Sequence, residues 1–595
     1  MAYDFRAATL PNALNQILFA QLIRHADEDA DAFWFKHALV QDTAYASLLR
    51  HDRKRLHRLV AETLEQTTPE RRDELAPRLA EHFDEAGETQ RALFYFQRAA
   101  ENAAARYANQ EALDFYTRAL DAAEELQADT RDSLYRARGM VYERIGEFEH
   151  ARADLETARR IAQETGDAHA EWQSLLDLGY AWASRDYART GEYYEKALEL
   201  ARASGDDARL AHTLNRVGNW HVNNDEPQRA VSYHTEALRM FEAQENARGI
   251  AETRDLLSMA NWLGADYLAA EEHANAARAQ FEALGDSLAV VNIQAIGDLK
   301  YGLLQGDTIV TAPRPQNVQH GDTAILERLQ QLGWRAGEAF SSMVLGEGFA
   351  TAGEYARGLE LERAAMATAR EINHRQWLAG ATMLHGEILA RVLNFETALL
   401  SLENALTLAR ELGSMHWTRT GSGFFAAALI AQNDFTRATE ILDTALPSDA
   451  RALSVGQRQV WAARAELALA QHDAARALHA LTQLMRDAAN VTATTVIPRV
   501  WILRARALAL QNDLQAAEPL LRAAHLEAHN THQPGWEWRS AAYLAQVYRA
   551  QGRDADAERE ANAAQNIVKT LADNLNDLTA RETFVTRARE IIWGA

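Results

Sequence analysis

The sequence predicts an all-α protein in which pairs of antiparallel helices stack into a solenoid. The first observation is a scarcity of helix breakers: Gly 30 and Pro 10 make up about 7% of 595 residues, below the usual combined share of roughly 12%. The second is a small residue that returns at nearly constant spacing along most of the chain. Regular repeats of this length are typical of stacked helix pairs that share one continuous core.

The recurring small residue defines a period of about 40 residues. Successive intervals are 40, 39, 40, 39, 49, 40, 40, 39, 40 and 40 residues. The positions are Gly139, Gly179, Gly218, Ser258, Gly297, Gly346, Gly386, Ala426, Ala465, Ala505 and Ala545. So regular a spacing over more than 400 residues predicts one structural unit per period.

Further small residues follow at fixed offsets, twelve and nineteen positions later, as at Ala151 and Ala158. Two helices approach closely only where one of them presents Gly or Ala, so these offsets predict where the members of each pair meet. Short polar turns such as QNDF (432–435), QNDL (511–514) and QGRD (551–554) separate the apolar-periodic segments.

This pattern resembles the tetratricopeptide repeat (TPR), whose usual period is about 34 residues. The longer period here predicts roughly one and a half extra helical turns in each pair. The resemblance covers residues 75–570 and implies a right-handed TPR-like superhelix with a concave and a convex face.

One interval is 49 residues, and the excess lies in LLQGDTIVTAPRPQNVQHGDT (303–323). Two interpretations stay open for this insertion loop. It is either a tolerated surface insertion between helices or a functional loop that folds over the concave face.

The segment FWFKHALVQDTAYASLLRHDRKRLHRLVAETLE (33–65) carries a second resemblance, to the junction before the TPR-like sensor of bacterial STAND-type signalling ATPases. These ATPases include proteins linked to nucleotide cyclases and transcription activators. The matching residues are Phe35, His37, Ala38, Leu39, Gln41, Ala44, Tyr45, Leu48, Leu49, Leu56, His57 and Glu65. Residues 79–120 and 566–592 are similar to later parts of the same proteins.

The chain departs from that family in two ways. Residues 10–22 resemble the start of the family's winged-helix region but run almost directly into the junction, so most of that region is left out. The phosphate-binding loop GxxxxGK[ST] is absent from the sequence, so the ATPase and cyclase activities do not carry over. We therefore expect a degenerate winged-helix remnant with connecting helices at 1–74, the solenoid at 75–570 and a C-terminal capping helix at 571–595.

Composition and motifs argue against several classes of function. The net charge of −22 disfavours nucleic acid and anionic membranes as partners. Cys 0 excludes thiolate metal sites and cysteine nucleophiles. HExxH, GxSxG and GxGxxG arrangements are missing, so we expect no enzyme, cofactor or metal. The sequence lacks both a membrane-length apolar run and a signal-peptide pattern, and we expect a cytoplasmic protein.

Candidate binding residues lie on the first helix of each pair, three before, one after and four or five after the small position. Polar and aromatic side chains share this face in several neighbouring repeats. They are Tyr180, His212, Asn215, Asn219, Asn223, Asp255, Trp262, Gln294, Asp298, Tyr301 and Glu347. Such a face suits a peptide or a small polar ligand, but it also fits an ordinary solvated surface. The later repeats, with Ala427, Ile430, Ala462 and Leu469, look more apolar and suited to a bound helix.

Two functions from different classes follow from these observations. The first is a non-catalytic sensor or scaffold that binds a protein, a peptide or a small-molecule inducer in its concave face. The second is a regulatory subunit of a transcription-activator or nucleotide-cyclase complex that docks through its N-terminal helices. The sequence leaves the oligomeric state open.

Overall fold

The structure is a computed structural model of the 595-residue chain. It describes residues 10–26, 29–287, 289–290, 292–293, 308, 324–331, 333–489, 491–492 and 495–594. Two compact units divide the chain, residues 1–138 and residues 139–595. The boundary expected at 74/75 lies inside the first unit, where α3 packs on α4, and it stays a prediction.

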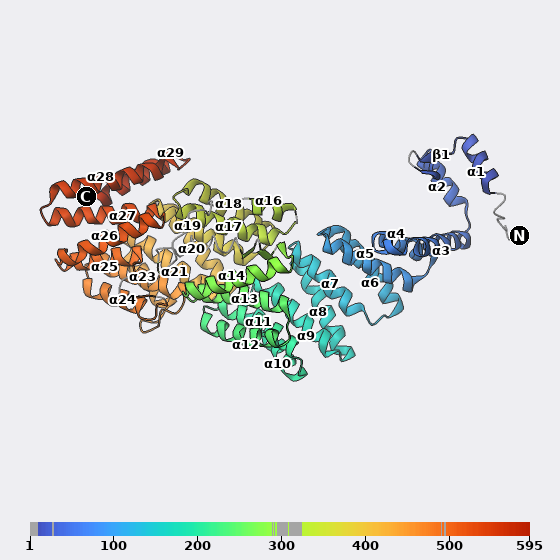
Figure 1. The fold of residues 1–595 in the computed structure, drawn as a ribbon, viewed down its shortest axis with the longest axis horizontal. Helices are drawn as coiled ribbons and strands as arrows, with labels where there is room; N and C mark the ends of the chain where they lie inside the picture. The colour runs from blue at the N-terminus through green and yellow to red at the C-terminus, as the bar shows by residue number, and fades with distance from the viewer. Residues whose placement is uncertain are drawn as a thin grey trace. The chain divides into compact units, whose positions relative to one another are not determined.

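The first unit joins a short hairpin to a row of helices (Figure 1). Strands β1 (Ile23–Ala26) and β2 (Asp29–Phe35) pair antiparallel, with Ile23 opposite Phe35. The helical elements are α1 (Leu10–Phe19), α2 (Ala38–Ser47), α3 (Arg50–Thr67), the 3-10 helix η1 (Pro69–Arg71), α4 (Arg72–Ala86), α5 (Thr89–Ala105), α6 (Asn109–Leu126) and α7 (Arg131–Arg144), which crosses into the second unit. The hairpin is an exception to the all-α expectation within the described part of this unit.

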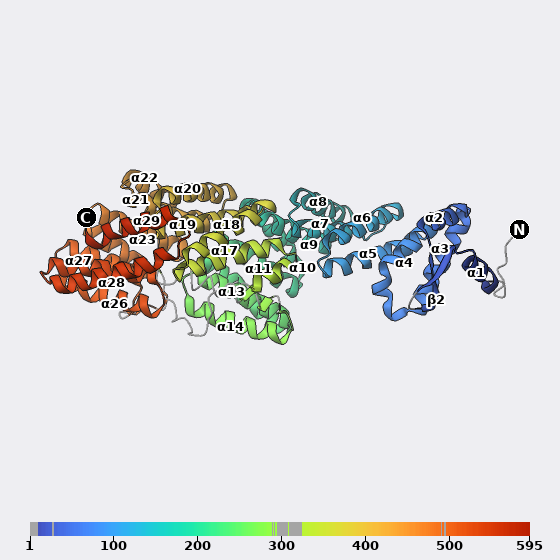
Figure 2. The same ribbon diagram turned by 90° about the horizontal axis from the view of Figure 1, so that it is seen from above.

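The second unit is a solenoid of helix pairs, and Figures 1 and 2 show its segments in chain order from α8 to α29. The earlier helices are α8 (Phe148–Thr165), α9 (Ala168–Ala183), α10 (Tyr187–Ser204), α11 (Asp207–Asn223), α12 (Pro227–Ala243), α13 (Ala247–Leu263), α14 (Tyr267–Ala283), α16 (Ala324–Gln331), α17 (Arg335–Thr351) and α18 (Tyr355–Glu371). The later ones are α19 (Arg375–Arg391), α20 (Phe395–Leu412), α21 (Met415–Ala431), α22 (Phe435–Ala445), α23 (Val455–Ala470), α24 (Ala474–Arg486), α25 (Pro498–Leu510), α26 (Leu514–Asn530), α27 (Pro534–Ala550), α28 (Asp554–Asp573) and α29 (Leu578–Trp593). The predicted all-α helical-repeat fold is confirmed.

The small residues of the repeat lie where paired helices touch. A Cβ on Gly346 would meet the carbonyl oxygen of Gly358 at 3.1 Å, and a Cβ on Gly358 would meet that of Gly346 at 2.7 Å. These two glycines are twelve residues apart, the predicted offset. Larger side chains there would force α17 and α18 apart, so the period follows from helix packing.

The polar turns link successive helices tightly because the Asn takes a left-handed backbone conformation and the following Asp caps the next helix. In QNDF and QNDL, Asn433 and Asn512 take the left-handed conformation, with φ of 60° and 63°. Asn tolerates this region better than most residues. Asp434 and Asp513 then cap the next helix, accepting hydrogen bonds from the backbone N–H of Arg437 (3.2 Å) and Ala516 (3.1 Å).

Contacts between distant repeats turn the second unit into a closed superhelix. Asp225 forms an ion pair with Arg419 at 2.6 Å, across 194 residues of sequence. The carbonyl of Leu393 accepts a hydrogen bond from Arg587, also 194 residues away. One superhelical turn therefore takes about five 40-residue repeats. Successive turns touch, and the first helices of the pairs enclose a lumen.

Candidate functional site: a lumenal cavity with an arginine–aromatic strip

The first helices of the later repeats enclose a cavity of about 390 Å³. Five of them contribute to its wall, namely α19, α21, α23, α25 and α27. The end of α17, the first residues of α18 and α20, the residues Leu393 and Gln533 in turns, and Ile591 of α29 also contribute. This size lies within the range of small-ligand sites, roughly 300–1,000 Å³.

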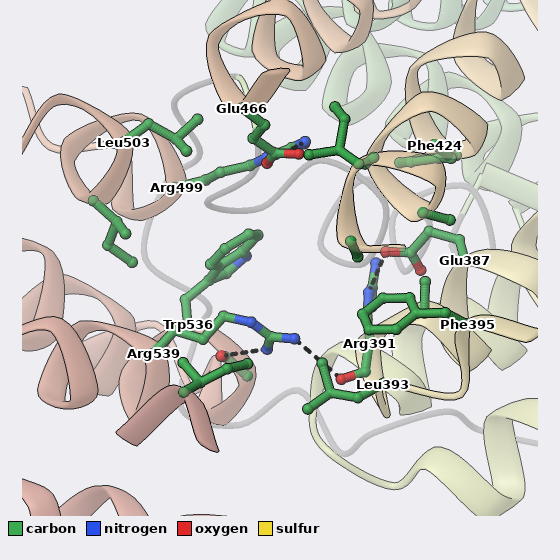
Figure 3. A pocket seen from close by; sticks show the side chains of 18 of the residues that line it. Glu387, Arg391, Leu393, Phe395, Phe424, Glu466, Arg499, Leu503, Trp536 and Arg539 are labelled. Carbon is green, nitrogen blue, oxygen red and sulfur yellow. Dashed lines mark hydrogen bonds and ion pairs between the residues drawn. The ribbon is translucent and has the colours of Figure 1, made fainter. Parts of the chain in front are cut away.

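Apolar side chains make up one part of the wall. Phe424, Ala427 and Ile430 come from α21, Ile502 from α25 and Phe395 from the start of α20. Figure 3 shows Phe424 and Phe395 on the same side of the cavity, with Leu503 across from them. An apolar or aromatic portion of a ligand would fit against this part of the wall.

Charged side chains surround Arg391. Its Nε donates to Glu387 at 2.6 Å, and its two Nη atoms donate to Thr351 at 3.0 Å and to Glu347 at 2.5 Å. Burial opposes the charge, but the two carboxylates outweigh it and raise the pKa of Arg391. Burial, with Glu347 and Glu387 beside it, raises the pKa of Glu362 well above its ordinary value.

Helices α25 and α27 bring arginines and aromatic rings together at another part of the cavity wall. From α25, the guanidinium of Arg499 lies 5.9 Å from the ring centre of Trp536, and that of Arg506 lies 4.7 Å from the ring centre of Tyr543. Both aromatic residues belong to α27 and are seven residues apart, as are the two arginines. Between the rings on α27, Arg539 also lines the cavity. We call Arg499, Arg506, Trp536, Arg539 and Tyr543 the arginine–aromatic strip.

The arginines of the strip differ in their partners. Arg499 donates to Glu466 at 3.0 and 3.1 Å and to Gln459 at 2.8 Å. Arg539 donates to two backbone carbonyls, Gly535 at 2.9 Å and Arg391 at 3.1 Å, and its guanidinium lies 4.4 Å from the ring centre of Trp538. Figure 3 shows Arg539 reaching from α27 toward Leu393. Burial lowers the pKa of Arg539, and the negative charge of Glu387 offsets this only in part.

The predicted residues on α11 have structural partners. Asn215 is 6% exposed; its Nδ2 donates to Thr253 at 2.7 Å and its Oδ1 lies 3.1 Å from Nδ1 of His234. Asn223 accepts a hydrogen bond from Gln376 at 3.3 Å, at a contact between superhelical turns, and donates to the carbonyl of Asn219 at 3.1 Å. Asn215 therefore lies in the core, and Asn223 joins two turns.

The other predicted residues are scattered over the unit. His212 packs edge-on against Phe241, Tyr180 is partly exposed beside Arg216, and Trp262 is buried in the core. Asp255 is half-buried on α13. Among the members of the set that the structure describes, only Glu347 approaches the cavity, through Arg391. Gln294, Asp298 and Tyr301, like nearly all of the 303–323 loop, lie outside the described residues.

The offsets used for the candidate residues nevertheless describe the cavity wall. One position after each small residue, the later repeats carry Glu387, Ala427, Glu466 and Arg506, and all four line the cavity. Continuing the same stripe past Glu347 would therefore have found these residues. The general apolar character of the later repeats hid the few charged positions among them.

Two further findings bear on chemistry and location. Within the described ranges, the structure contains no group of three or more His, Asp or Glu side chains arranged to hold a metal ion. No described helix is both long enough and apolar enough to cross a membrane.

Comparisons with known proteins agree with the repeat architecture. Residues 179–243 match the tetratricopeptide repeat family model. No curated protein matches the chain.

Several solved structures match parts of the chain at low identity. The Rap conjugation gene regulator of plasmid pLS20, solved with the Phr* peptide, is 15% identical; the match covers 48% of this chain and 76% of that one, with a TM-score of 0.41. The apo form of RapI is 16% identical over 47% and 98% of the two chains, with a TM-score of 0.38. A STAND protein with a TPR sensor from Pyrococcus horikoshii is 14% identical over 74% and 58%, with a TM-score of 0.33. The chain is an all-α helical-repeat solenoid, and its segment 179–243 is similar to tetratricopeptide repeats.

Proposed function

We propose that this protein is a non-catalytic binding scaffold of bacterial signal transduction that holds a ligand in its lumenal cavity. The observation that carries the proposal is the cavity itself, about 390 Å³ in volume and built by five consecutive repeats. Apolar side chains with a few charged groups among them are the usual lining of a ligand site.

The position of the cavity gives binding a way to affect the whole superhelix. Arg391 on α19 and Arg539 on α27 both line the cavity, and they are joined by a hydrogen bond across 148 residues of sequence. A ligand that contacts both helices would stabilise this junction between the ends of one turn. Stabilising one arrangement of repeats over another is how a scaffold passes binding on to a partner. By its resemblance to STAND proteins, the element that receives the signal is a signalling ATPase.

Filling the cavity tests this proposal. Ala427 lines the cavity, and Ala427→Trp would occupy it. Ala475, on the outer helix α24, is exposed, so Ala475→Trp adds the same side chain where no cavity exists. Native mass spectrometry of protein purified from its source should show a bound mass on the wild type and on Ala475→Trp. Ala427→Trp should lack that mass. An equal bound mass on all three proteins contradicts the proposal, as does its absence from the wild type.

A specific observation also favours the second function, docking through the N-terminal helices. Large apolar side chains of the first unit are exposed, including Phe19 (93%), Leu39 (77%), Leu49 (63%) and Leu59 (59%). Exposed apolar side chains gathered in one small unit are typical of interaction surfaces. Under this function, Leu39→Asp with Leu49→Asp should abolish capture of a partner protein. Leu400→Asp, at an exposed position of the second unit, should leave capture unchanged.

A further inference from the structure

We propose that the ligand of the lumenal cavity is an amphiphilic organic anion whose carboxylate or phosphate binds Arg506 and Arg539. This inference deepens the proposed function, because it rests on the cavity being a ligand site. It names the charge of the ligand, the two side chains that recognise the charge, and the wall that takes the apolar part.

The first step in the argument is the geometry of the arginine–aromatic strip. Seven residues span two helical turns, about 10.5 Å at 1.5 Å per residue. Arg499 and Arg506 therefore lie about that far apart on α25, each over an aromatic ring of α27. The N–H groups of Arg499 are used by Glu466 and Gln459. The ring face of Tyr543, in contrast, holds the guanidinium of Arg506 in place while leaving its N–H edge available for hydrogen bonds.

The second step is the charge balance of the cavity. Four arginines and two glutamates line it. Arg391 is paired with Glu387 and also with Glu347, which does not itself line the cavity, and Arg499 is paired with Glu466. Arg506 and Arg539 have no carboxylate partner in the part of the chain that the structure describes. These two cations stand out in a protein whose net charge is −22.

The third step is the cost of leaving such charges unpaired. Arg506 and Arg539 are half-buried in the cavity wall, and a counter-charge or hydrogen-bond acceptors stabilise a cation that has lost part of its hydration. Two backbone carbonyls and the Trp538 ring compensate Arg539 in part. Tyr543 offers Arg506 only a ring face. An oxyanion next to both would form charge-assisted hydrogen bonds, the strongest that these donors make.

The fourth step concerns the remainder of the ligand. Ile502 and Leu503 lie on α25 between the two arginines, and Ile430 and Phe424 of α21 line the same cavity. An inorganic ion would leave this apolar wall exposed to water. A hydrocarbon or aromatic group attached to the oxyanion would instead bury it, at about 25 cal/mol per Å² of apolar surface.

Ligand-observed NMR titrations with defined probes test the inference. The small probes are 3-phenylpropionate, phenylphosphonate and the neutral 3-phenylpropanamide. The peptide probes are acetyl-Phe-Glu-Phe-Glu-amide and its counterpart with Gln in place of Glu. Tighter binding of the acidic peptide than of the small acids would point to a peptide as the source of the oxyanion. The reverse order would point to a free organic acid.

The variants form a matched pair on one helix. Arg506→Gln removes a cavity-lining cation, and Arg504→Gln removes an exposed cation two residues away. Both change the net charge equally, so long-range attraction cannot separate them. We expect Arg506→Gln to weaken the binding of the anionic probes about tenfold, since one charge-assisted hydrogen-bond donor group is lost. Arg504→Gln should bind them as the wild type does.

Three results would overturn the inference: equal affinity for 3-phenylpropionate and its amide, equal loss in both arginine variants, or no binding of any anion at millimolar concentration. Each of these is separate from failure of the proposed function. If a co-purified mass is lost in Ala427→Trp but kept in Arg506→Gln, the cavity binds a ligand and the oxyanion inference is wrong. If Ala427→Trp keeps the mass, the proposed function itself is wrong.

Discussion

Gly423 shows how a single residue can be fixed by a neighbouring helix. A Cβ at this position of α21 would lie 2.8 Å from the backbone carbonyl carbon of Gln459 and 2.9 Å from its oxygen. Backbone atoms of the packed helix α23 have no room to withdraw. The intrinsic preference of helices for Ala over Gly, about 1 kcal/mol, therefore loses to the overlap.

Gly423→Ala should destabilise the protein by about 1–3 kcal/mol, the usual cost of overpacking. Differential scanning calorimetry would record this as a lower Tm. Gly535→Ala is the control, since its Cβ would approach side-chain atoms rather than backbone, namely the hydroxyl of Tyr355 at 3.2 Å and a guanidinium nitrogen of Arg539 at 3.8 Å. An increase in Tm for Gly423→Ala would show that the two helices are not in close contact.

Asn215→Ala should lower stability by about 1–3 kcal/mol, because Thr253 and His234 each lose a buried hydrogen-bond partner. It should leave binding of the anionic probes unchanged, since Asn215 does not line the cavity. Calorimetry and the NMR titration measure the two effects separately. Loss of affinity with unchanged stability would instead place the ligand on α11, as the sequence pattern suggested.

At the scale of single residues, the sequence predicted which positions face inward better than it predicted which side chains contact one another. The offset rule located the inward face, because small residues fix the orientation of each first helix. The offset rule could not distinguish Glu347 from Asn215. Glu347 reaches the cavity through its ion pair with Arg391, whereas the amide of Asn215 donates a hydrogen bond to Thr253 inside the core. That difference depends on which side chains of neighbouring helices lie opposite, and one sequence does not contain this information.

At the scale of the element, helix α19 begins with an unusual capping residue. Nδ1 of His374 accepts a hydrogen bond from the backbone N–H of Trp377 at 3.2 Å, which only a neutral imidazole can do. Burial, helped by the positive charge of Arg185, lowers the pKa of His374 to about 3. Burial also lowers the pKa of His416, in the first turn of α21, to about 4.

Stability should therefore fall as the pH drops from about 6.5 toward 4. In that range the unfolded chain binds protons at these histidines and the folded chain does not, so acid favours unfolding. Above pH 6.5 these histidines are neutral in the folded and the unfolded chain, so their full contribution to the free energy of unfolding is present. His374→Asn keeps a capping side chain without the titration, so its Tm should fall less than that of the wild type between pH 7 and pH 4.5. Equal losses of Tm would exclude His374 as a contributor.

The boundaries of elements were well predicted wherever a turn had clear chemistry. The Asn–Asp turns ended and restarted helices as expected, because left-handed Asn and capping Asp act locally. The β1–β2 hairpin is the exception. Its aromatic run Phe33–Phe35 favours a strand. The resemblance of this segment to a known junction predicted only the helix that follows it.

At the scale of the whole molecule, contacts between superhelical turns hold the second unit closed. Asp225, whose side chain is 1% exposed, relies on Arg419 from a repeat 194 residues later. Arg419→Ala would leave this buried carboxylate hydrogen-bonded to the side chains of Ser454 and Gln457 but without its arginine, at a cost of about 3–5 kcal/mol. We expect faster amide hydrogen exchange at both 223–228 and 414–419, measured by mass spectrometry.

The control for this variant is a surface ion pair of the same chemistry. Arg437 and Glu403 lie 3.0 Å apart with about half of each side chain exposed, so Arg437→Ala should cost about 0–1 kcal/mol. Its exchange at 223–228 should equal that of the wild type. Unchanged exchange in Arg419→Ala would mean that the turns are held together by other contacts.

The sequence pattern did not predict that successive turns of the superhelix contact one another. The period fixes the helix pairs, but the turn of the superhelix depends on a small rotation from each repeat to the next, summed over about five repeats. The pairing of Asp225 with Arg419 follows from that sum. So does the cavity, because its wall needs α19 and α27 to return to the same lumen.

A crystal of the protein soaked with 3-(4-bromophenyl)propionate tests the central claim most directly. The bromine gives an anomalous signal that locates the ligand without assumptions. The account predicts one strong peak inside the cavity, against the apolar wall of Phe424 and Ile430, with the carboxylate at Arg506 and Arg539. A peak on α11 or on the outer surface, or an empty cavity at saturating ligand, would contradict it.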